Sequence, residues 1–303
     1  MNNLPTFKQL RYLVTLEQHL HFGKAATACS VTQSAFSSAI KELEIILNVS
    51  LVDRTNRSVV FTPVGTRISS EARSVLQGLE GISHIASAAQ RPLSGQLHLG
   101  VVPTVAPFVL PKLVPVLRRK FPALELHLRE EKTLVIHQML MNGDLDLMLL
   151  ALPYELGNTE TISIFNDKFK LAYNKDTELI DPDNYKHVTT SDNSILLLED
   201  GHCMREHALS ACNFAHKDKI SNFSASGIYS LVQMVNSDLG ITFIPQMAID
   251  CGILKNTQVH TRDLEEDSHR VIGLAWRKSS ARVKEFKLLA AVIRDCMRPD
   301  ENT

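Results

Sequence analysis

The residues with the most reactive chemistry in this sequence are two cysteines, Cys203 and Cys212, which lie nine positions apart. Directly before the first stands Asp200-Gly201, a pair that looks like a turn capping a helix that starts near Cys203. A helix N-terminus lowers the pKa of a thiol through its dipole and its free N–H groups, and thiolates react with peroxides. His202 and Arg205 can add positive or hydrogen-bonding character. The pattern predicts a redox-reactive thiol at Cys203.

The spacing of the two cysteines sets a condition on any reaction between them. If residues 204–211 are helical, a rise of about 1.5 Å per residue separates the cysteines by roughly 13 Å along the axis, on opposite faces. A disulfide requires Cα atoms within about 7 Å of each other. The two thiols can therefore join only if this segment unwinds or refolds. Spacing alone leaves open a simpler interpretation, in which both are ordinary buried thiols.

The rest of the composition narrows the class of protein. Five cysteines without a C-x-x-C pair do not suggest a disulfide framework or a structural zinc site, so we expect no metal and no cofactor. Buried, inert thiols are expected for most cysteines, and Cys29, Cys251 and Cys296 are assigned structural roles. A net charge of −1 over 303 residues gives no global attraction to nucleic acid. The absence of a signal peptide and of an apolar run of about 18 residues indicates a soluble, cytoplasmic protein.

The first 62 residues have the periodicity of a small helical domain with a hairpin. Apolar spacing predicts helices near 7–16, 23–29 and from Thr32 onward, and the alternating stretch 52–61 predicts a wing. Thr32 can cap the third helix, whose polar first turn would enter the major groove of DNA. A three-helix module with another role is the alternative. The residues expected to contact DNA are Thr32, Gln33, Ser34, Ser37, Lys41, Arg54 and Arg57.

A long helix is expected over about 63–89, since Thr62 can act as its N-cap and Pro63 suits the first helical position. It carries an apolar stripe of Leu76, Leu79, Ile82 and Ile85. We favour a dimerising linker over a helix packed on its own domain, because at this point of the sequence no globular core is yet available beside it.

Beyond residue 91, predicted strands and helices alternate. Strands near 97–102, 124–129 and 145–150 enclose helices near 111–120 and 135–141, which implies an open parallel α/β sheet. A second set follows Phe165, and a late strand at 271–276 with a closing helix at 284–297 is expected to return to the first lobe. The predicted domains are 1–62, the linker 63–90, and an effector domain 91–303 with lobe I at 91–166 and 269–303 and lobe II at 167–268.

The first 66 residues resemble the N-terminus of LysR-type transcriptional regulators. The resemblance implies a winged helix-turn-helix, a dimerising linker helix and a two-lobed, periplasmic-binding-protein-like α/β effector domain. Ser34 stands where many members have proline. The matching elements are Phe22, Ala25, Ala26, Val31, Gln33, Ser37, Ile40, Leu43, Glu44, Leu51, Arg54, Thr62 and Gly65.

Leu197 to Arg205, followed by Cys212, resembles the redox motif of the hydrogen-peroxide sensors of that family. The resemblance continues at residues 100–107 and 270–274. It implies that Cys203 is the peroxidatic thiol, that Cys212 resolves it in a reversible intramolecular disulfide, and that Glu206 replaces a common aspartate. Lys132 and Leu134 also depart from the pattern. The residues implied to line the peroxide pocket are Thr104, Thr133, His202, Arg205 and Arg270.

The resemblance further implies an activator of antioxidant genes that binds double-stranded promoter DNA as a homotetramer, a dimer of dimers. Its other partners would be RNA polymerase, hydrogen peroxide, and glutathione with glutaredoxin for reduction. Two alternatives remain: a regulator that binds a small-molecule inducer between the lobes, with inert cysteines, and a thiol peroxidase. The helix-turn-helix argues against the enzyme.

Overall fold

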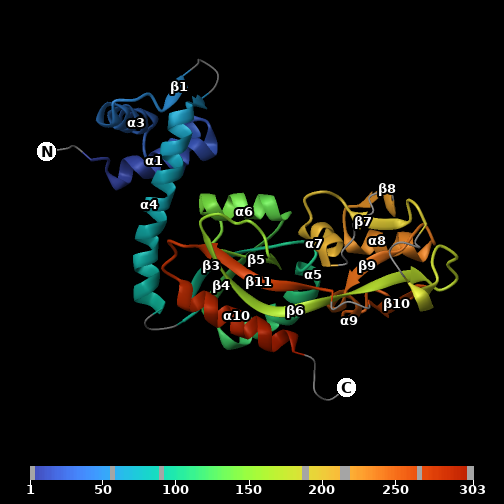
Figure 1. Ribbon diagram of the computed structural model, residues 1–303. Helices are drawn as coiled ribbons and strands as arrows, with labels where there is room; N and C mark the ends of the chain where they lie inside the picture. Colours follow the sequence, from blue (N-terminus) through green and yellow to red (C-terminus); the bar gives the residue numbers. More distant parts are fainter. Residues whose placement is uncertain are drawn as a thin grey trace. The chain divides into compact units, whose positions relative to one another are not determined.

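The computed structural model describes residues 4–54, 59–88, 92–185, 191–211, 219–264 and 268–298 (Figure 1). The chain divides into two compact units. The first comprises Met1–Gln90 with Ser279–Arg282, and the second comprises Arg91–Lys278 with Val283–Thr303. Among the described helices, none combines the length and apolar character needed to cross a membrane.

The first unit contains the expected helices and wing. Its core is apolar and includes Phe36, Ile40 and Leu43 from one face of the third helix, all fully buried. Oγ1 of Thr32 accepts a hydrogen bond from the backbone N–H of Ala35, so this threonine is the predicted N-cap. The elements are α1 (Phe7–His19), α2 (Phe22–Ala28), α3 (Gln33–Leu47), β1 (Val52–Arg54), β2 (Val59–Phe61) and α4 (Pro63–Ala88).

Helix α4 is anchored at its first turn. Oγ1 of Thr62 accepts from the backbone N–H of Gly65 at 2.9 Å, which confirms the predicted cap. Gly65 lies so close to the chain before β1 that an added Cβ would be 2.0 Å from the carbonyl oxygen of Leu51. Further along α4, Leu79 and Ile82 of the predicted stripe are exposed in the single chain, while the side chain of Ile85 lies outside the described residues.

The second unit is built on one mixed sheet, with a small parallel pair beside it. The strand order in the described residues is β10-β6-β11-β5-β3-β4, with β9 also paired to β6, and β7 pairs with β8. Helix α6 lies over β3 and β5 on one face, and α10 packs on α5 on the other (Figure 1). The strands are β3 (Gly95–Val101), β4 (Leu124–Glu130), β5 (Leu147–Leu152), β6 (Thr159–Asn174), β7 (Ile195–Leu198), β8 (Ile220–Ala225), β9 (Thr242–Pro245), β10 (Val259–Asp263) and β11 (His269–Arg277).

The parallel arrangement expected for the first three strands of this unit is confirmed, but the sheet as a whole is mixed. Only β3 pairs in parallel with β4 and β5 in the large sheet, whereas β11, β6, β9 and β10 pair antiparallel with their neighbours. The return of the last strand is confirmed, because β11 pairs with β5 along its length. The helices are α5 (Ala106–Lys120), α6 (Thr133–Asn142), α7 (Cys203–Ala211), α8 (Ile228–Asn236), α9 (Gln246–Asp250) and α10 (Val283–Met297).

Helix α5 begins five residues before the predicted start at Pro111. Pro107 occupies its first turn, where a missing N–H is tolerated, and Pro111 and Pro115 lie inside the helix. The buried face carries Phe108, Val109 and Leu113, so packing on the sheet outweighs the helix-breaking tendency of the two internal prolines.

Candidate functional site: a buried thiol at the ends of three parallel strands

The candidate site lies where the three parallel strands of the large sheet end. Thr104 follows β3, Thr133 begins α6 shortly after β4, and Pro153 follows β5. The carboxyl edge of such strands is the usual binding position in open α/β sheets. Both threonines are buried, at 2% and 1% exposure. Arg270 from β11 and helix α7 complete the site.

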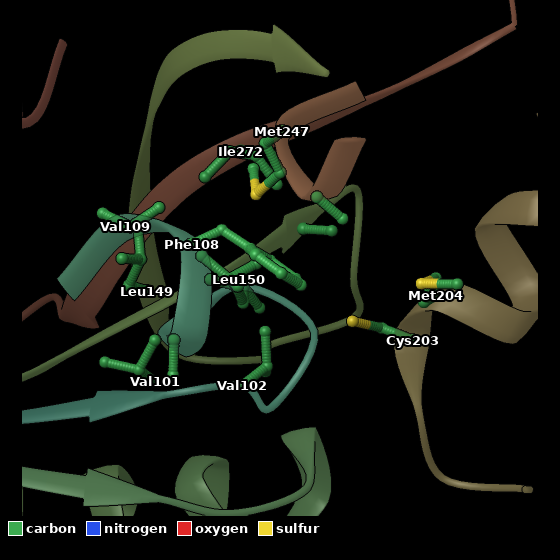
Figure 2. Packing of buried hydrophobic residues seen from close by; sticks show 14 of the residues in the cluster. Val101, Val102, Phe108, Val109, Leu149, Leu150, Cys203, Met204, Met247 and Ile272 are labelled. Atoms are coloured by element: carbon green, nitrogen blue, oxygen red, sulfur yellow. The ribbon is translucent and has the colours of Figure 1, made fainter. Parts of the chain in front are cut away.

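Cys203 is the first residue of α7, as the sequence predicts. Its side chain is 3% exposed and belongs to the apolar core of the second unit. Figure 2 shows the sulfur pointing from the start of the helix towards the side where Val102 and Leu150 lie. Asp200 and Gly201 form the preceding turn, in which Gly201 has a φ of 88°. A side chain is strained at that angle, so the glycine allows the sharp entry into α7.

The surroundings of Cys203 favour its thiolate form. Burial raises the pKa of the thiol, but contacts with His207 and Thr133 and the charges of Arg270 and His207 outweigh burial, so the pKa lies below its ordinary value. Among the described residues, Oγ1 of Thr133 and Nδ1 of His207 are buried without a closed hydrogen bond. The contacts with sulfur are therefore looser than ideal hydrogen bonds, and we take them as polar groups placed to stabilise negative charge.

His207 is the functional residue that the sequence predictions missed. It lies four positions after Cys203 in α7, so both side chains project from the same helix face. Its Nε2 lies 3.0 Å from the carbonyl oxygen of Pro153. Burial lowers the pKa of His207, but contact with Cys203 and with that carbonyl outweighs it, and the net pKa is raised. The i, i+4 spacing of a cysteine and a histidine was the signal available in the sequence.

Arg270 is held by a closed polar network. Its Nε pairs with Oδ2 of Asp167 at 2.9 Å, and its two terminal nitrogens donate to Oγ1 and the carbonyl oxygen of Thr104 at 3.1 and 2.9 Å. Oδ1 of Asp167 accepts from the backbone N–H of Met247 at 3.0 Å. Burial raises the pKa of Asp167, and Arg270 counteracts that only in part. The network fixes the guanidinium whose charge reaches Cys203.

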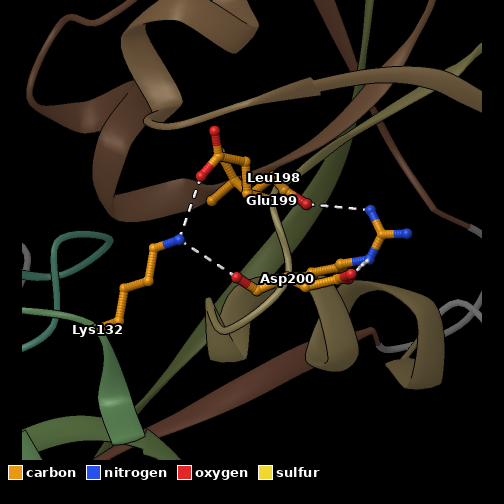
Figure 3. A network of polar contacts seen from close by, with 5 residues as sticks. Lys132, Leu198, Glu199 and Asp200 are labelled. Atoms are coloured by element: carbon orange, nitrogen blue, oxygen red, sulfur yellow. Dashed lines mark hydrogen bonds and ion pairs between the residues drawn. The ribbon is translucent and has the colours of Figure 1, made fainter. Parts of the chain in front are cut away.

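The other two predicted pocket residues belong to the loop before α7. Arg205 donates to the carbonyl oxygen of Leu198 at 3.0 Å and pairs with Asp200 at 3.1 Å, so its guanidinium is turned to the loop. Lys132 pairs with Glu199 at 3.1 Å and donates to the carbonyl oxygen of Asp200 at 3.3 Å (Figure 3). The loop is thus held from both sides.

His202 is buried beside this charged group. Burial and the nearby Lys132 lower its pKa, while Glu199 acts in the opposite direction. Its Nε2 is one of the buried atoms without a hydrogen-bond partner among the described residues. Lys132, which departs from the expected pattern, therefore takes part in the electrostatics of the histidine next to the thiol.

Cys212 lies outside the described residues, which end at Ala211 in this part of the chain. The other three cysteines carry free thiols and are less buried than expected. Cys251 is exposed, with its Sγ 3.7 Å from the carbonyl oxygen of Phe108, and Cys29 and Cys296 are half-buried. The prediction that these three thiols are buried is therefore wrong.

Four of the residues predicted to contact DNA lie at the start of α3, and Lys41 lies further along the same helix. Thr32, Gln33, Ser34 and Lys41 are exposed, and Ser37 is half-buried. Oγ1 of Thr32 and Oγ of Ser34 lie 3.1 Å apart, so the serine is compatible with the cap. Arg57 and the side chain of Arg54 lie outside the described residues.

Both parts of the chain match known families. Residues 7–66 match the family described as "Bacterial regulatory helix-turn-helix protein, lysR family", and residues 90–298 match the family described as "LysR substrate binding domain". The two matches together cover nearly all of the described structure.

Individual relatives are similar over almost their whole length. The chain is 36% identical over 296 residues to the HTH-type transcriptional regulator EstR of Acinetobacter baylyi, covering 97% of this chain and 98% of the relative. It is also 36% identical to a probable hydrogen peroxide-inducible genes activator of Streptomyces viridosporus, covering 97% and 95%. A full-length OxyR from Pseudomonas aeruginosa, solved as a variant with one cysteine replaced by aspartate, superposes with a TM-score of 0.80 at 32% identity, covering 96% and 95%.

Proposed function

The chain belongs to the LysR family of bacterial transcriptional regulators, and from that premise we propose that it senses hydrogen peroxide through Cys203. The observation that carries the proposal is the buried thiol at the start of α7. Thr133, His207 and Arg270 surround this thiol and lower its pKa. A regulator that only bound a metabolite would need no such thiolate. The names of a peroxide-inducible activator and of OxyR among similar proteins support the same assignment.

The proposed reaction begins with the Cys203 thiolate attacking one oxygen of hydrogen peroxide. A sulfur–oxygen bond forms, the oxygen–oxygen bond breaks, and the leaving hydroxide takes up a proton to become water. The sulfur is oxidised to sulfenic acid and the peroxide is reduced. The Cys212 thiol then attacks that sulfur, and the hydroxyl group leaves with a proton as a second water, which completes the disulfide. Two thiols of glutathione, acting with glutaredoxin, would later reduce it.

The proposed disulfide requires a change in α7. The helix runs from Cys203 to Ala211, so a rise of about 1.5 Å per residue separates its two ends by roughly 12 Å. Cα atoms must come within about 7 Å for the bond to form. Oxidation would therefore unwind α7 and release the loop held by Arg205 and Lys132.

The proposed output is a change in DNA binding. The chain would bind promoter DNA through α3 and the wing as a homotetramer of two dimers, paired through the exposed apolar side chains of α4. Rearranged effector domains would change the spacing of the helix-turn-helix units and the contact with RNA polymerase. The predicted contacts of Thr104 and Arg270 with peroxide belong to the same proposal.

The test is a disulfide map of the reduced full-length chain after micromolar peroxide, with a promoter reporter measured in parallel. We expect a Cys203–Cys212 linkage and induction, both absent in Cys203→Ser. Cys251→Ser is the matched control, because this thiol is exposed and outside the site. Induction that persists in Cys203→Ser would sink the proposal.

A second candidate, a regulator that answers to a small-molecule inducer, is favoured by one observation. The similarity to EstR, whose name mentions no peroxide, is as high as that to the peroxide-inducible activator. Full induction in Cys203→Ser by a metabolite that also raises the thermal midpoint of the second unit would support this candidate.

A further inference from the structure

We infer that Nδ1 of His207 is the proton acceptor for the Cys203 thiol, so that the two residues form a thiolate–imidazolium pair before peroxide arrives. This inference deepens the proposed function and rests on it for the identity of the oxidant. Its starting point is the arrangement in α7, where residues four apart lie on one face of the helix. Cys203 and His207 each shift the pKa of the other, so the two groups interact across that single turn.

The second step concerns which nitrogen of His207 carries the proton. Nε2 lies 3.0 Å from the carbonyl oxygen of Pro153, and a carbonyl oxygen can only accept a hydrogen bond. Nε2 must therefore carry a hydrogen. In the neutral imidazole this leaves Nδ1 unprotonated, with its lone pair available. Nδ1 is buried and closes no hydrogen bond with the described residues, and the Cys203 thiol projects from the same helix face one turn earlier.

The third step excludes the other groups near the sulfur as the acceptor. Arg270 is a donor only, and its nitrogens are engaged by Asp167 and Thr104. The hydroxyl of Thr133 is far too weak a base. Tyr154 is near Cys203, but burial, Glu206 and Cys203 raise its pKa, so it stays protonated. Burial and Lys132 lower the pKa of His202, which makes it a weaker base than His207, whose pKa is raised.

The same histidine can complete the first chemical step. The proton leaves sulfur for Nδ1, and the thiolate attacks the peroxide. As the oxygen–oxygen bond breaks, the imidazolium returns that proton to the leaving hydroxide, which becomes water. Neutral His207 and a sulfenic acid at Cys203 remain, so charge and protons balance. A positioned histidine that acts first as base and then as acid is a common device for activating cysteine.

Charged groups around the pair act in both directions. Arg270 from β11 favours the thiolate and disfavours the imidazolium. Lys132 and Glu199 face the neighbouring His202, and Glu206 lies in α7 near Tyr154. Because these groups stay in place when His207 is replaced, a change of pH profile in that variant reports on His207 itself.

The experiment uses the full chain in which Cys203 is the only cysteine. The thiolate is followed by its ultraviolet absorbance against pH, and sulfenic acid formation by mass spectrometry after peroxide. Gln at 207 can still hydrogen-bond but cannot accept the proton, so His207→Gln should raise the midpoint of thiolate formation by about one unit or more, with about a tenfold loss of thiolate well below that midpoint. His137→Gln is the matched control, because His137 Nε2 also lies near a carbonyl oxygen, that of Leu156 at 3.1 Å.

An unchanged midpoint in His207→Gln, with the parent chain still oxidised at Cys203, would overturn the inference and leave the proposed function standing. A shifted midpoint with no oxidation of Cys203 by peroxide in the parent would support the pair and overturn the proposed function. Equal shifts in the His137 and His207 variants would also overturn the inference, because they would show a general effect of losing a histidine.

Discussion

Replacing Arg270 with methionine should destabilise the second unit strongly and in a pH-dependent way. The Arg270 side chain is fully buried, and the change leaves the carboxylate of Asp167, which is 2% exposed, without its cation. The backbone N–H of Met247 would remain as a partner of Asp167. The carbonyl oxygen and hydroxyl of Thr104 would lose their donors.

The loss in free energy of unfolding depends on whether the Asp167 carboxylate stays charged or takes up a proton. Removing one partner of a buried pair costs about 3–5 kcal/mol. An upper limit on the charge penalty is the cost of protonating Asp167 at about pH 7, which is about 1.36 kcal/mol for each of about three units, or about 4 kcal/mol. In Arg270→Met, the buried carboxyl of Asp167 has a pKa in the folded state well above its pKa in the unfolded state. The variant therefore loses stability as pH rises between these values and regains about 2.7 kcal/mol from about pH 7 to pH 5.

Denaturant unfolding followed by tryptophan fluorescence measures this effect in the second unit alone. Trp276 is the single tryptophan of the chain, and it is buried in β11. The double variant Arg270→Met, Asp167→Leu removes both charges and should be more stable than Arg270→Met at neutral pH. A loss below about 1 kcal/mol, or a loss equal at pH 5 and pH 7, would refute the account of a stranded buried charge.

Two further changes test other parts of the chain. Gly65→Ala should impair folding of the first unit and abolish DNA binding, because the new Cβ would meet the carbonyl oxygen of Leu51 at 2.0 Å. Gly78→Ala is the control and should be neutral or stabilising, because its new Cβ would have no atom within 4 Å. Thermal unfolding and gel-shift assays measure both variants. Thr133→Val should raise the pKa of the Cys203 thiol and slow its oxidation by peroxide in stopped-flow measurements at neutral pH, since a hydroxyl that favours the thiolate is lost. An oxidation rate equal to that of the parent would contradict the role given to Thr133.

The parts of the fold that the sequence predicts well depend on local signals. Thr32 and Thr62 cap their helices as expected, and α7 begins at Cys203 after the Asp-Gly turn. The mixed character of the sheet could not be found in this way. The antiparallel pairing of β6 with β11 joins residues about a hundred positions apart, and it is decided by packing rather than by neighbouring residues.

In the candidate site, too, local signals in the sequence predict some features, and contacts between distant residues decide the others. Cys203 stands out in the sequence by its place at the start of a helix, whereas the partners of Arg270 are Thr104 and Asp167, which are remote in sequence. Arg205 is close to Cys203 in sequence, but its guanidinium turns to the preceding loop. Proximity in sequence is a weak guide to the direction in which a long, flexible side chain points.

Strand β6 has a mechanical consequence for the effector unit. Its first part pairs with β11, and its last part pairs with β9 and β10, so one continuous backbone belongs to both halves of the sheet. Sliding the halves past each other would break ladder hydrogen bonds, whereas a strand can change its twist by several degrees with the ladder intact. Relative motion of the two halves of the sheet is therefore easiest as a rotation about the axis of β6.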